Sequence, residues 1–303
     1  MVKDRTRRAV AAAVDAAREF GLHVERATVL HDVFSVVVHL EPEPVVARIP
    51  VVLTASLLPE RQAARQQREL DVAAWLDAQG VPVVAPSPLT PRSPVRRDGY
   101  AMTFWELADV ADDHQPYLGV DMSYAARLHA ALARYPGELP FLAPFNDGLP
   151  DMLAALDGVE DLTTDEIDRA REEYEALRRI LADAQTFTST FPQASVQPIQ
   201  GDGPSHNVIR TKSGVLFSDF EDVCLGPVEW DLAMLGPDAV DRYVVSARAL
   251  SLRATDPEVL KVMDYARRLQ FVGCLTLVPQ LPLLAQGLTT ALDEWRSTPA
   301  FSG

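Results

Sequence analysis

Short valine-rich segments recur in the first part of the chain, and each is bounded by polar or proline-containing turns. Ala27–Leu30, Phe34–Leu40 and Val45–Val52 have this pattern, which is typical of an antiparallel meander. The residues before them, 1–21, consist of basic residues followed by an alanine-rich run that Asp15, Arg18 and Glu19 interrupt, a pattern that fits an amphipathic helix. We therefore expect one opening helix followed by three strands.

The apolar spacing then becomes helical. Between Pro59 and Gln79 the residues Leu70, Ala73 and Leu76 fall on one stripe, and the glycine that follows is a stop signal. Two more strands are expected at Val81–Val84 and Tyr100–Trp105, joined by a loop rich in proline and arginine. The sequence thus predicts a lobe with a five-stranded antiparallel sheet and one long helix.

Beyond this lobe the pattern is mostly helical. Ser123–Arg134, Thr164–Ala184 and Pro257–Leu269 all carry apolar residues at helical spacing. The exception is Pro192–Asp222, where Gly, Pro, Asn and Asp surround a short strand at Val215–Ser218. A helical domain presents its chemistry on such a loop. The fold class expected is α+β, with two lobes at residues 1–105 and 106–303.

Composition narrows the classes of partner. The net charge of −15 argues against nucleic acid, which needs clustered Lys and Arg, and favours a neutral or cationic small molecule, although acidity also serves plain solubility. Cys224 and Cys274 have no metal or disulfide spacing, and no segment has the ~20 apolar residues that cross a bilayer. We expect a cytoplasmic protein without a membrane partner; the oligomeric state is left open.

One constellation carries chemistry. Asp202 lies in the run Gly-Asp-Gly-Pro-Ser-His-Asn, five residues before Asn207, and Asp219 follows twelve residues after that Asn. Phosphoryl transfer needs one acid to accept the hydroxyl proton and oxygen ligands to hold Mg²⁺ against the phosphates. The competing interpretation is turn capping, since Asp and Asn in a Gly- and Pro-rich loop commonly cap turns. His206 competes with Asp202 as a base, but a structural or substrate-side role suits it better.

These residues resemble the aminoglycoside phosphotransferase family, whose catalytic loop reads His-Gly-Asp-x-x-x-x-Asn before a later Asp-Phe-Glu/Asp. The resemblance continues at Trp230-Asp231-Leu232-Ala233 and at Leu128-His129-Ala130. It implies a protein-kinase-like fold with a nucleotide-binding lobe at 1–105 and a catalytic, substrate-binding lobe at 106–303. Asp202 would be the catalytic acid–base and Asn207 and Asp219 the metal ligands. Asp231 would brace the loop, and Glu221 would support the metal or a cationic substrate.

The resemblance also implies a nucleotide site in the first lobe. Arg48 would contact the phosphates and pair with Glu69, while the hinge residues Phe104, Trp105, Glu106 and Leu107 would lie against the adenine. Alternatively, Arg48 and Glu69 are solvated surface charges and Trp105 is core packing.

Three departures from the family pattern stand out. Gln200 replaces the family His, Arg48 replaces Lys, and no glycine occurs between Gly21 and Gly80. An arginine offers phosphate a bidentate fork instead of a point charge, and the missing glycines exclude a Gly-x-Gly-x-x-Gly clamp over the phosphates.

The function expected is an ATP-dependent O-phosphotransferase that uses Mg²⁺, with GTP as the alternative nucleotide. Its acceptor would be a hydroxyl of an antibiotic such as an aminoglycoside, which would confer antibiotic resistance, or of a metabolite. The alternative from another class is a nucleotide-binding pseudokinase that regulates a partner. A metal-dependent hydrolase would need clustered His or carboxylate ligands that the sequence lacks.

Overall fold

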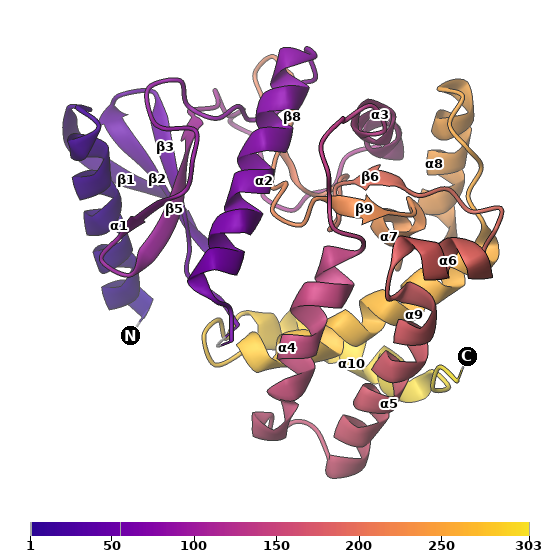
Figure 1. Cartoon of the computed structure of the whole chain (residues 1–303). Helices are drawn as coiled ribbons and strands as arrows, with labels where there is room; N and C mark the ends of the chain where they lie inside the picture. Colours follow the sequence, from indigo (N-terminus) through magenta and orange to yellow (C-terminus); the bar gives the residue numbers. More distant parts are fainter. Residues whose placement is uncertain (1, 55, 303) are drawn as a thin grey trace. The chain divides into compact units, whose positions relative to one another are not determined.

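The computed structural model describes residues 2–54 and 56–302, and the chain forms two compact units. The first unit consists of Met1–Leu118 and Val208–Glu221, and the second of Gly119–Asn207 and Asp222–Gly303. Figure 1 shows the sheet in the first unit and the mainly helical second unit. The α+β class is confirmed. The division of function at residues 105 and 106 stays a prediction.

The first unit is built around a five-stranded antiparallel sheet with the order β1-β2-β3-β5-β4. Its strands are β1 (Val24–Asp32), β2 (Ser35–Pro42), β3 (Val45–Pro50), β4 (Val95–Arg97) and β5 (Tyr100–Glu106). Four of the five expected strands are therefore present.

The expected strand at Val81–Val84 is wrong. Its Val83 forms an isolated parallel bridge to Phe217, and Pro82 has no N–H to contribute to a ladder. The fifth strand, β4, lies within the expected loop instead. It is joined to β5 by Asp98 and Gly99, which have φ of 50° and 82°, as a two-residue hairpin turn requires. The Asp-Gly pair is a strong hairpin signal that identifies this turn.

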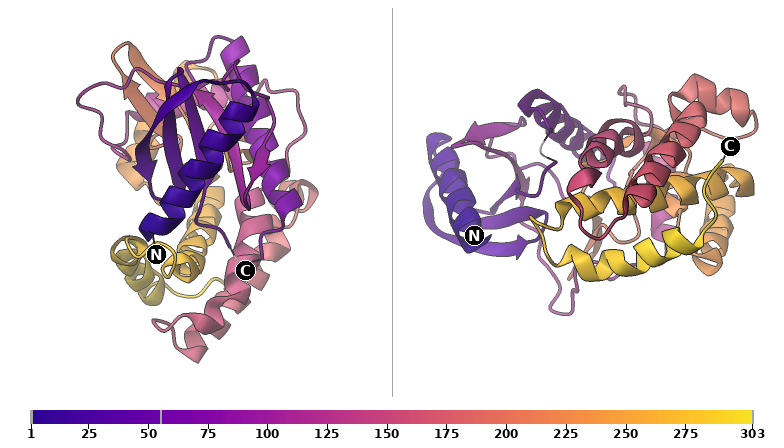
Figure 2. Two further views of the ribbon diagram at one scale, coloured as in Figure 1. Left: turned by 90° about the vertical axis from the view of Figure 1, so that its left-hand side faces the viewer. Right: turned by 90° about the horizontal axis from the view of Figure 1, so that it is seen from below.

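Two helices flank the sheet. The expected opening helix is α1 (Val2–Glu19), and Figures 1 and 2 show it lying across one face of the sheet. Its fully buried Ala9, Ala13 and Ala16 share one core with Val36 and Val38 of β2, because side chains as small as alanine let the helix approach closely. The second helix, α2 (Pro59–Ala78), contacts β5.

A hairpin of β7 (Val208–Thr211) and β8 (Gly214–Phe217) completes the first unit. Val84 donates its N–H to the carbonyl of Phe217, 2.9 Å away, which ties the hairpin to the segment after α2. The strand expected at Val215–Ser218 is thus confirmed within one residue at each end.

The second unit contains the expected helices and several more. The first of these are α3 (Met122–Leu132), α4 (Leu149–Ala154), α5 (Thr164–Leu181) and α6 (Ala184–Thr190). The rest are α7 (Glu229–Leu232), α8 (Pro237–Ala249), α9 (Pro257–Cys274) and α10 (Leu284–Ser297). A short antiparallel pair, β6 (Gln197–Ile199) and β9 (Cys224–Gly226), lies among them.

Helix α9 is central to this unit, since it packs against α4, α5, α7 and α10. Asp256 caps its start by accepting from the N–H of Glu258 at 2.9 Å. The large buried aromatic residues of the unit include Trp230, Tyr243 and Trp295. These residues belong to the hydrophobic core of the second unit.

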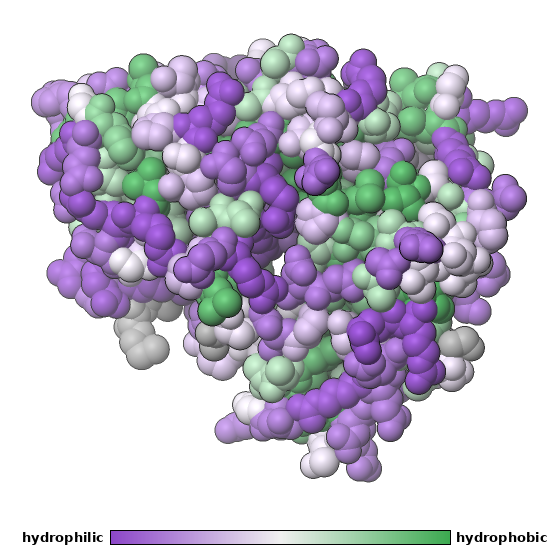
Figure 3. All heavy atoms as spheres, in the orientation of Figure 1, coloured by the Kyte–Doolittle hydropathy of each residue, from purple (hydrophilic) through white to green (hydrophobic). Residues whose placement is uncertain are grey.

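Hydrophilic side chains cover much of the face shown in Figure 3, and apolar residues appear there in small patches. None of the helices within residues 2–54 and 56–302 is long and apolar enough to pass through a bilayer.

Candidate active site

The loop that follows β6 in the second unit has a backbone that only glycine allows at one position. Gly201 has a φ of +89°, and a Cβ there would lie 2.0 Å from the carbonyl oxygen of Asp222. The carboxylate of Asp231 accepts the N–H of Gln200 at 2.9 Å and that of Gly201 at 2.8 Å. Asp231 thus holds the start of the loop, as the sequence led us to expect.

Asp231 is itself fixed by a buried chain of hydrogen bonds. His129 Nε2 lies 3.0 Å from its Oδ2, and His129 Nδ1 lies 2.8 Å from the hydroxyl of Tyr243. Since a carboxylate only accepts, a neutral His129 donates from Nε2 and accepts at Nδ1. Burial raises the pKa of Tyr243 above its ordinary value, which keeps its hydroxyl a donor. His129 is therefore a packed core histidine with both ring nitrogens hydrogen-bonded.

Gln200 replaces the family His, and its side chain takes a defined place in the loop. Its Oε1 accepts the backbone N–H of Asp202 at 2.9 Å and of Gly203 at 2.7 Å. The residue is fully buried, so these two donors are satisfied away from water. The loop is therefore fixed by an amide where the family uses an imidazole.

Asp202 and Asn207 lie together at the surface of this loop. Asn207 Nδ2 donates to Asp202 Oδ2 at 2.9 Å, which leaves the amide oxygen of Asn207 as the acceptor atom of this side chain. The side chain of Asp202 is 49% exposed, so a substrate can reach it. His206 instead contacts Ser205, with 3.1 Å between Nδ1 and Oγ.

Arg267 of α9 is a neighbour of Asp202 that sequence reasoning missed. Its Nη2 donates to the carbonyl oxygen of Asp202 at 2.7 Å and to Oδ1 at 3.1 Å. The pattern of α9 marks a helix with two adjacent arginines and gives no sign which of them faces the loop. This contact spans 65 residues of sequence.

In the first unit, Arg48 of β3 lies among three carboxylates. Its Nη1 donates to Glu69 of α2 at 2.9 Å, and its Nη2 donates to Asp219 at 2.8 Å and to Glu221 at 2.5 Å. Arg65 pairs with Glu221 on its other side, at 3.1 Å. The expected Arg48–Glu69 ion pair is present, and Glu221 pairs with two arginines of the protein.

These acids differ in proton affinity because their neighbours differ. Burial raises the pKa of Glu69 to about 8, against the opposing charge of Arg48 and with the help of Asp219 and Glu221. Burial also acts on Glu221, but Arg65 and Arg48 outweigh it and lower the pKa to about 2. At neutral pH Glu69 therefore keeps its proton, and Arg48 and Arg65 face the two remaining acids of the cluster, Asp219 and Glu221.

Asp219 follows β8 with a φ of +58°, a left-handed conformation that costs energy in a residue other than glycine. Its side chain is 43% exposed while its Oδ1 accepts from Arg48. A strained, accessible carboxylate has the oxygen chemistry that Mg²⁺ prefers in its ligands.

The hinge residues divide into two kinds. Phe104 and Trp105 are buried, and the indole N–H of Trp105 donates to Thr103 Oγ1 at 2.8 Å. Glu106 and Leu107 are exposed at the end of β5. An adenine contact through these four residues stays a prediction, and the exposed pair offers the accessible surface.

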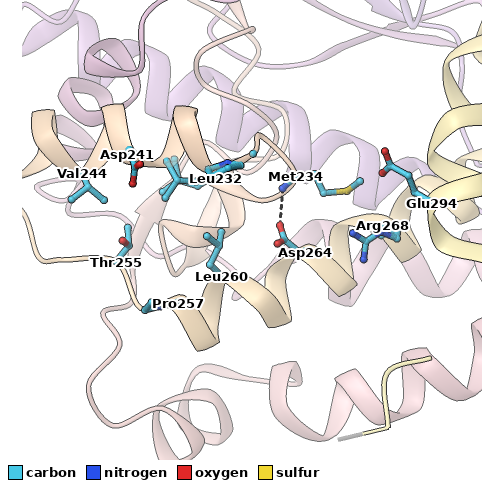
Figure 4. Close-up of a pocket in the computed structure, with 13 residues that line it drawn as sticks. Leu232, Met234, Asp241, Val244, Thr255, Pro257, Leu260, Asp264, Arg268 and Glu294 are labelled. Carbon is cyan, nitrogen blue, oxygen red and sulfur yellow. Dashed lines mark hydrogen bonds between the residues drawn. The ribbon is translucent and has the colours of Figure 1, made fainter. Parts of the chain in front are cut away.

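A separate pocket of about 550 Å³ lies in the second unit, between the segment after α7 and helices α8, α9 and α10 (Figure 4). Asp264 of α9 points toward Met234 there and accepts its backbone N–H at 2.7 Å, and Arg268 also lines the pocket. None of the site residues expected from the sequence is among its lining residues.

Within the described part of the chain, no three His, Cys, Asp or Glu side chains gather as a metal site. The donors expected here are instead the amide oxygen of Asn207 and the carboxylate of Asp219. Each of these two oxygen atoms is, by itself, a hard ligand of the kind that Mg²⁺ takes together with phosphate oxygens.

The comparisons with known proteins agree with these features. The profile of the phosphotransferase enzyme family matches residues 34–268, so the chain belongs to this family. No curated protein matches the sequence closely enough to count as a relative. The comparisons give no support to the pseudokinase alternative.

Solved structures with the same fold include kinases of small molecules. A microcompartment-associated aminopropanol kinase is 16% identical, with a TM-score of 0.60 over 94% of this chain and 98% of its own. A choline/ethanolamine kinase family protein from Mesorhizobium loti is 15% identical, with a TM-score of 0.57 over 99% and 96%. An amicoumacin kinase in complex with AMP-PNP and Ca²⁺ is 14% identical, with a TM-score of 0.60 over 97% and 96%. The protein-kinase-like fold is confirmed.

Proposed function

We propose that this protein is a small-molecule kinase that transfers the γ-phosphoryl group of ATP to a hydroxyl group, with Mg²⁺. The observation that carries the proposal is the pair of Asp202 and Asn207, 2.9 Å apart on a loop held by Asp231 and Gln200. A residue that only caps a turn would not need buried side chains to orient its loop. Here buried groups orient a loop whose acid, Asp202, is exposed. Membership of the phosphotransferase enzyme family supports the same reaction.

Each residue has a distinct part in this proposal. Asp202 accepts a hydrogen bond from the acceptor hydroxyl and takes its proton as the oxygen bonds to the γ-phosphorus, while the bond to the bridging oxygen breaks and ADP leaves. Asn207 and Asp219 would hold the ion, which when bound would neutralise charge on the phosphates. Arg48 contacts the phosphates, and Glu69 orients Arg48. Because the transition state is loose, positioning and electrostatics supply most of the acceleration.

The acceptor is proposed to be a small hydroxyl compound that carries a positive charge. The formal net charge of −15 favours a cation near the protein. The similar structures include an aminopropanol kinase and a choline kinase, whose names point to amino alcohols. Aminoglycosides are also hydroxyl compounds with positive charge. If they are the acceptors, the activity would confer antibiotic resistance. ATP is proposed before GTP, and a cytoplasmic location suits an ATP-dependent enzyme.

The test is phosphate incorporation from MgATP into a panel of amino alcohols, aminoglycosides and sugars. Wild type should phosphorylate at least one compound, and Asp202→Ala should lose transfer by roughly 10²–10⁴-fold while binding ATP as before. Asp168→Ala, which removes an exposed carboxylate from α5, is the matched control and should behave as wild type. Unchanged turnover in Asp202→Ala would defeat the assignment.

A further inference from the structure

Arg267 is a buried arginine that contacts the catalytic residue of the proposed reaction. It is 8% exposed, and its two terminal nitrogens have different partners. Nη2 donates to Asp202, at 2.7 Å to the carbonyl oxygen and 3.1 Å to Oδ1, and Nη1 donates to Gln270 Oε1 at 2.8 Å. One guanidinium group therefore holds both the main chain and the side chain of Asp202.

The guanidinium group of Arg267 also lies over two aromatic rings. Its guanidinium carbon lies 5.3 Å from the ring centre of Trp230 and 5.7 Å from that of Phe271. Trp230 also donates its indole N–H to the carbonyl oxygen of Gly201 at 2.8 Å. The platform on which Arg267 rests is thus fixed to the same loop that Arg267 orients.

Nearly every polar group around Asp202 now has a partner. Gln200 accepts the backbone N–H, Arg267 binds the backbone carbonyl and Oδ1, and Asn207 binds Oδ2. A carboxylate oxygen accepts two hydrogen bonds, so both oxygens keep a lone pair for a substrate. The direction of those lone pairs is set by the two donors on either side.

We propose that Arg267 is a positioning residue, which aims the Asp202 carboxylate at the acceptor hydroxyl; this inference rests on the proposed function. If Asn207 were its only partner, the Asp202 carboxylate could rotate about its side-chain bonds. The hydrogen bonds from Arg267 to Oδ1 and to the backbone carbonyl of Asp202 oppose this rotation. Misplacing a catalytic group by about 1 Å can cost on the order of 100-fold in rate. Arg267 acts through Asp202 and leaves nucleotide binding unaffected.

The experiment uses the full chain with MgATP and a mixture of amino alcohols and aminoglycosides, and measures ADP release. Arg267→Met keeps the length of the side chain and removes the fork; kcat should fall on the order of 100-fold with KM for ATP unchanged. Arg267→Lys keeps the charge and should restore part of the rate. The matched control is Arg268→Met on the same helix, which alters the pocket of Figure 4 and should stay within about twofold of wild type.

A double-mutant cycle with Asp202→Asn separates positioning from mere structure. If Arg267 works through Asp202, the double variant should be no slower than Asp202→Asn alone. Thermal melting shows whether each variant is folded, and Arg267→Lys carries the test if Arg267→Met is not. Wild-type kcat in a folded Arg267 variant, or an additional 100-fold loss in the Asp202→Asn background, would overturn the inference. A wild type without Mg²⁺-dependent turnover would overturn the proposed function first, and the inference with it.

Discussion

The charged groups of the two units are arranged in different ways. In the first, Arg48 and Arg65 face the three acids Glu69, Asp219 and Glu221, of which Glu69 keeps a proton at neutral pH. In the second, the backbone N–H, the backbone carbonyl and the carboxylate of Asp202 all have hydrogen-bond partners. The first cluster is therefore expected to change when a metal and phosphates bind, while the second is already arranged for the reaction.

This contrast separates what a substitution should damage. A change in the charge cluster of the first unit leaves a buried carboxylate without its counter-charge, which is costly for stability. A substitution in the loop of the second unit changes the orientation of Asp202 more than the local charge. Turnover should therefore be affected more than the free energy of unfolding. The predictions below test this separation.

The largest effect is expected for Arg48→Met. Glu69 is 1% exposed and would lose its ion-pair partner, so the free energy of unfolding should fall by about 3–5 kcal/mol. Urea unfolding at pH 9, where Glu69 is ionised in the folded protein, measures this loss. Arg48→Lys is the control that retains the charge, and it should lose less. A stability for Arg48→Met within about 0.5 kcal/mol of wild type would show that the cluster is not coupled.

The pH dependence of stability should follow Glu69. Its pKa is raised from the ordinary 4.5 to about 8 in the folded protein, so the native state keeps a proton that the unfolded state has lost between these values. The group therefore lowers stability as pH rises from 4.5 to 8, by at most about 1.4 kcal/mol per pH unit. Glu221, with its pKa lowered to about 2, stabilises above 4.5 and loses this contribution as pH falls toward 2.

Urea unfolding between pH 5 and pH 8 checks this account of Glu69. The variant Glu69→Gln should show a flatter profile than wild type in that window. Glu60→Gln, which changes an exposed acid in the first turn of α2, is the control and should keep the wild-type slope. Equal slopes in wild type and Glu69→Gln would contradict the raised pKa of Glu69.

A smaller effect on stability is expected at Gln200. Gln200→Ala leaves the N–H groups of Asp202 and Gly203 without their acceptor, so the free energy of unfolding should fall by about 1–3 kcal/mol. Turnover should fall as well, because the backbone N–H groups that orient Asp202 lose their acceptor. Gln200→His restores the family residue and should recover part of the rate. Thermal unfolding and turnover of both variants test this, and wild-type turnover in Gln200→Ala would show that the loop does not need the amide.

Most of the fold was predictable because its elements have strong local patterns. The valine-rich meander, α2 and α9 follow from periodicity and stop signals. The fifth strand was misplaced because proline and arginine around Val95–Arg97 hide a strand, while Val81–Val84 looks like one and makes only an isolated bridge. The Asp98-Gly99 turn was the overlooked signal.

The candidate site residues could be located in the sequence where they form part of a motif. Asp202, Asn207, Asp219 and Asp231 are separated by fixed spacings, and the ion pair of Arg48 with Glu69 follows from the family resemblance. The partners Arg267, Arg65 and Gln200 were not predictable. Their roles depend on which face of a helix meets a distant loop, or on where one amide oxygen points, and only packing decides that.

The proposed mechanism requires Asp219 to be a ligand of the Mg²⁺ ion that binds together with ATP. Calorimetry of ATP binding with and without Mg²⁺ tests it most directly, comparing wild type, Asp219→Ala and the control Asp112→Ala, which removes an exposed acid from the same unit. Asp219→Ala should bind MgATP roughly 30-fold more weakly, about 2 kcal/mol, and should bind metal-free ATP no more weakly than wild type. Wild-type affinity of Asp219→Ala for MgATP would contradict the account.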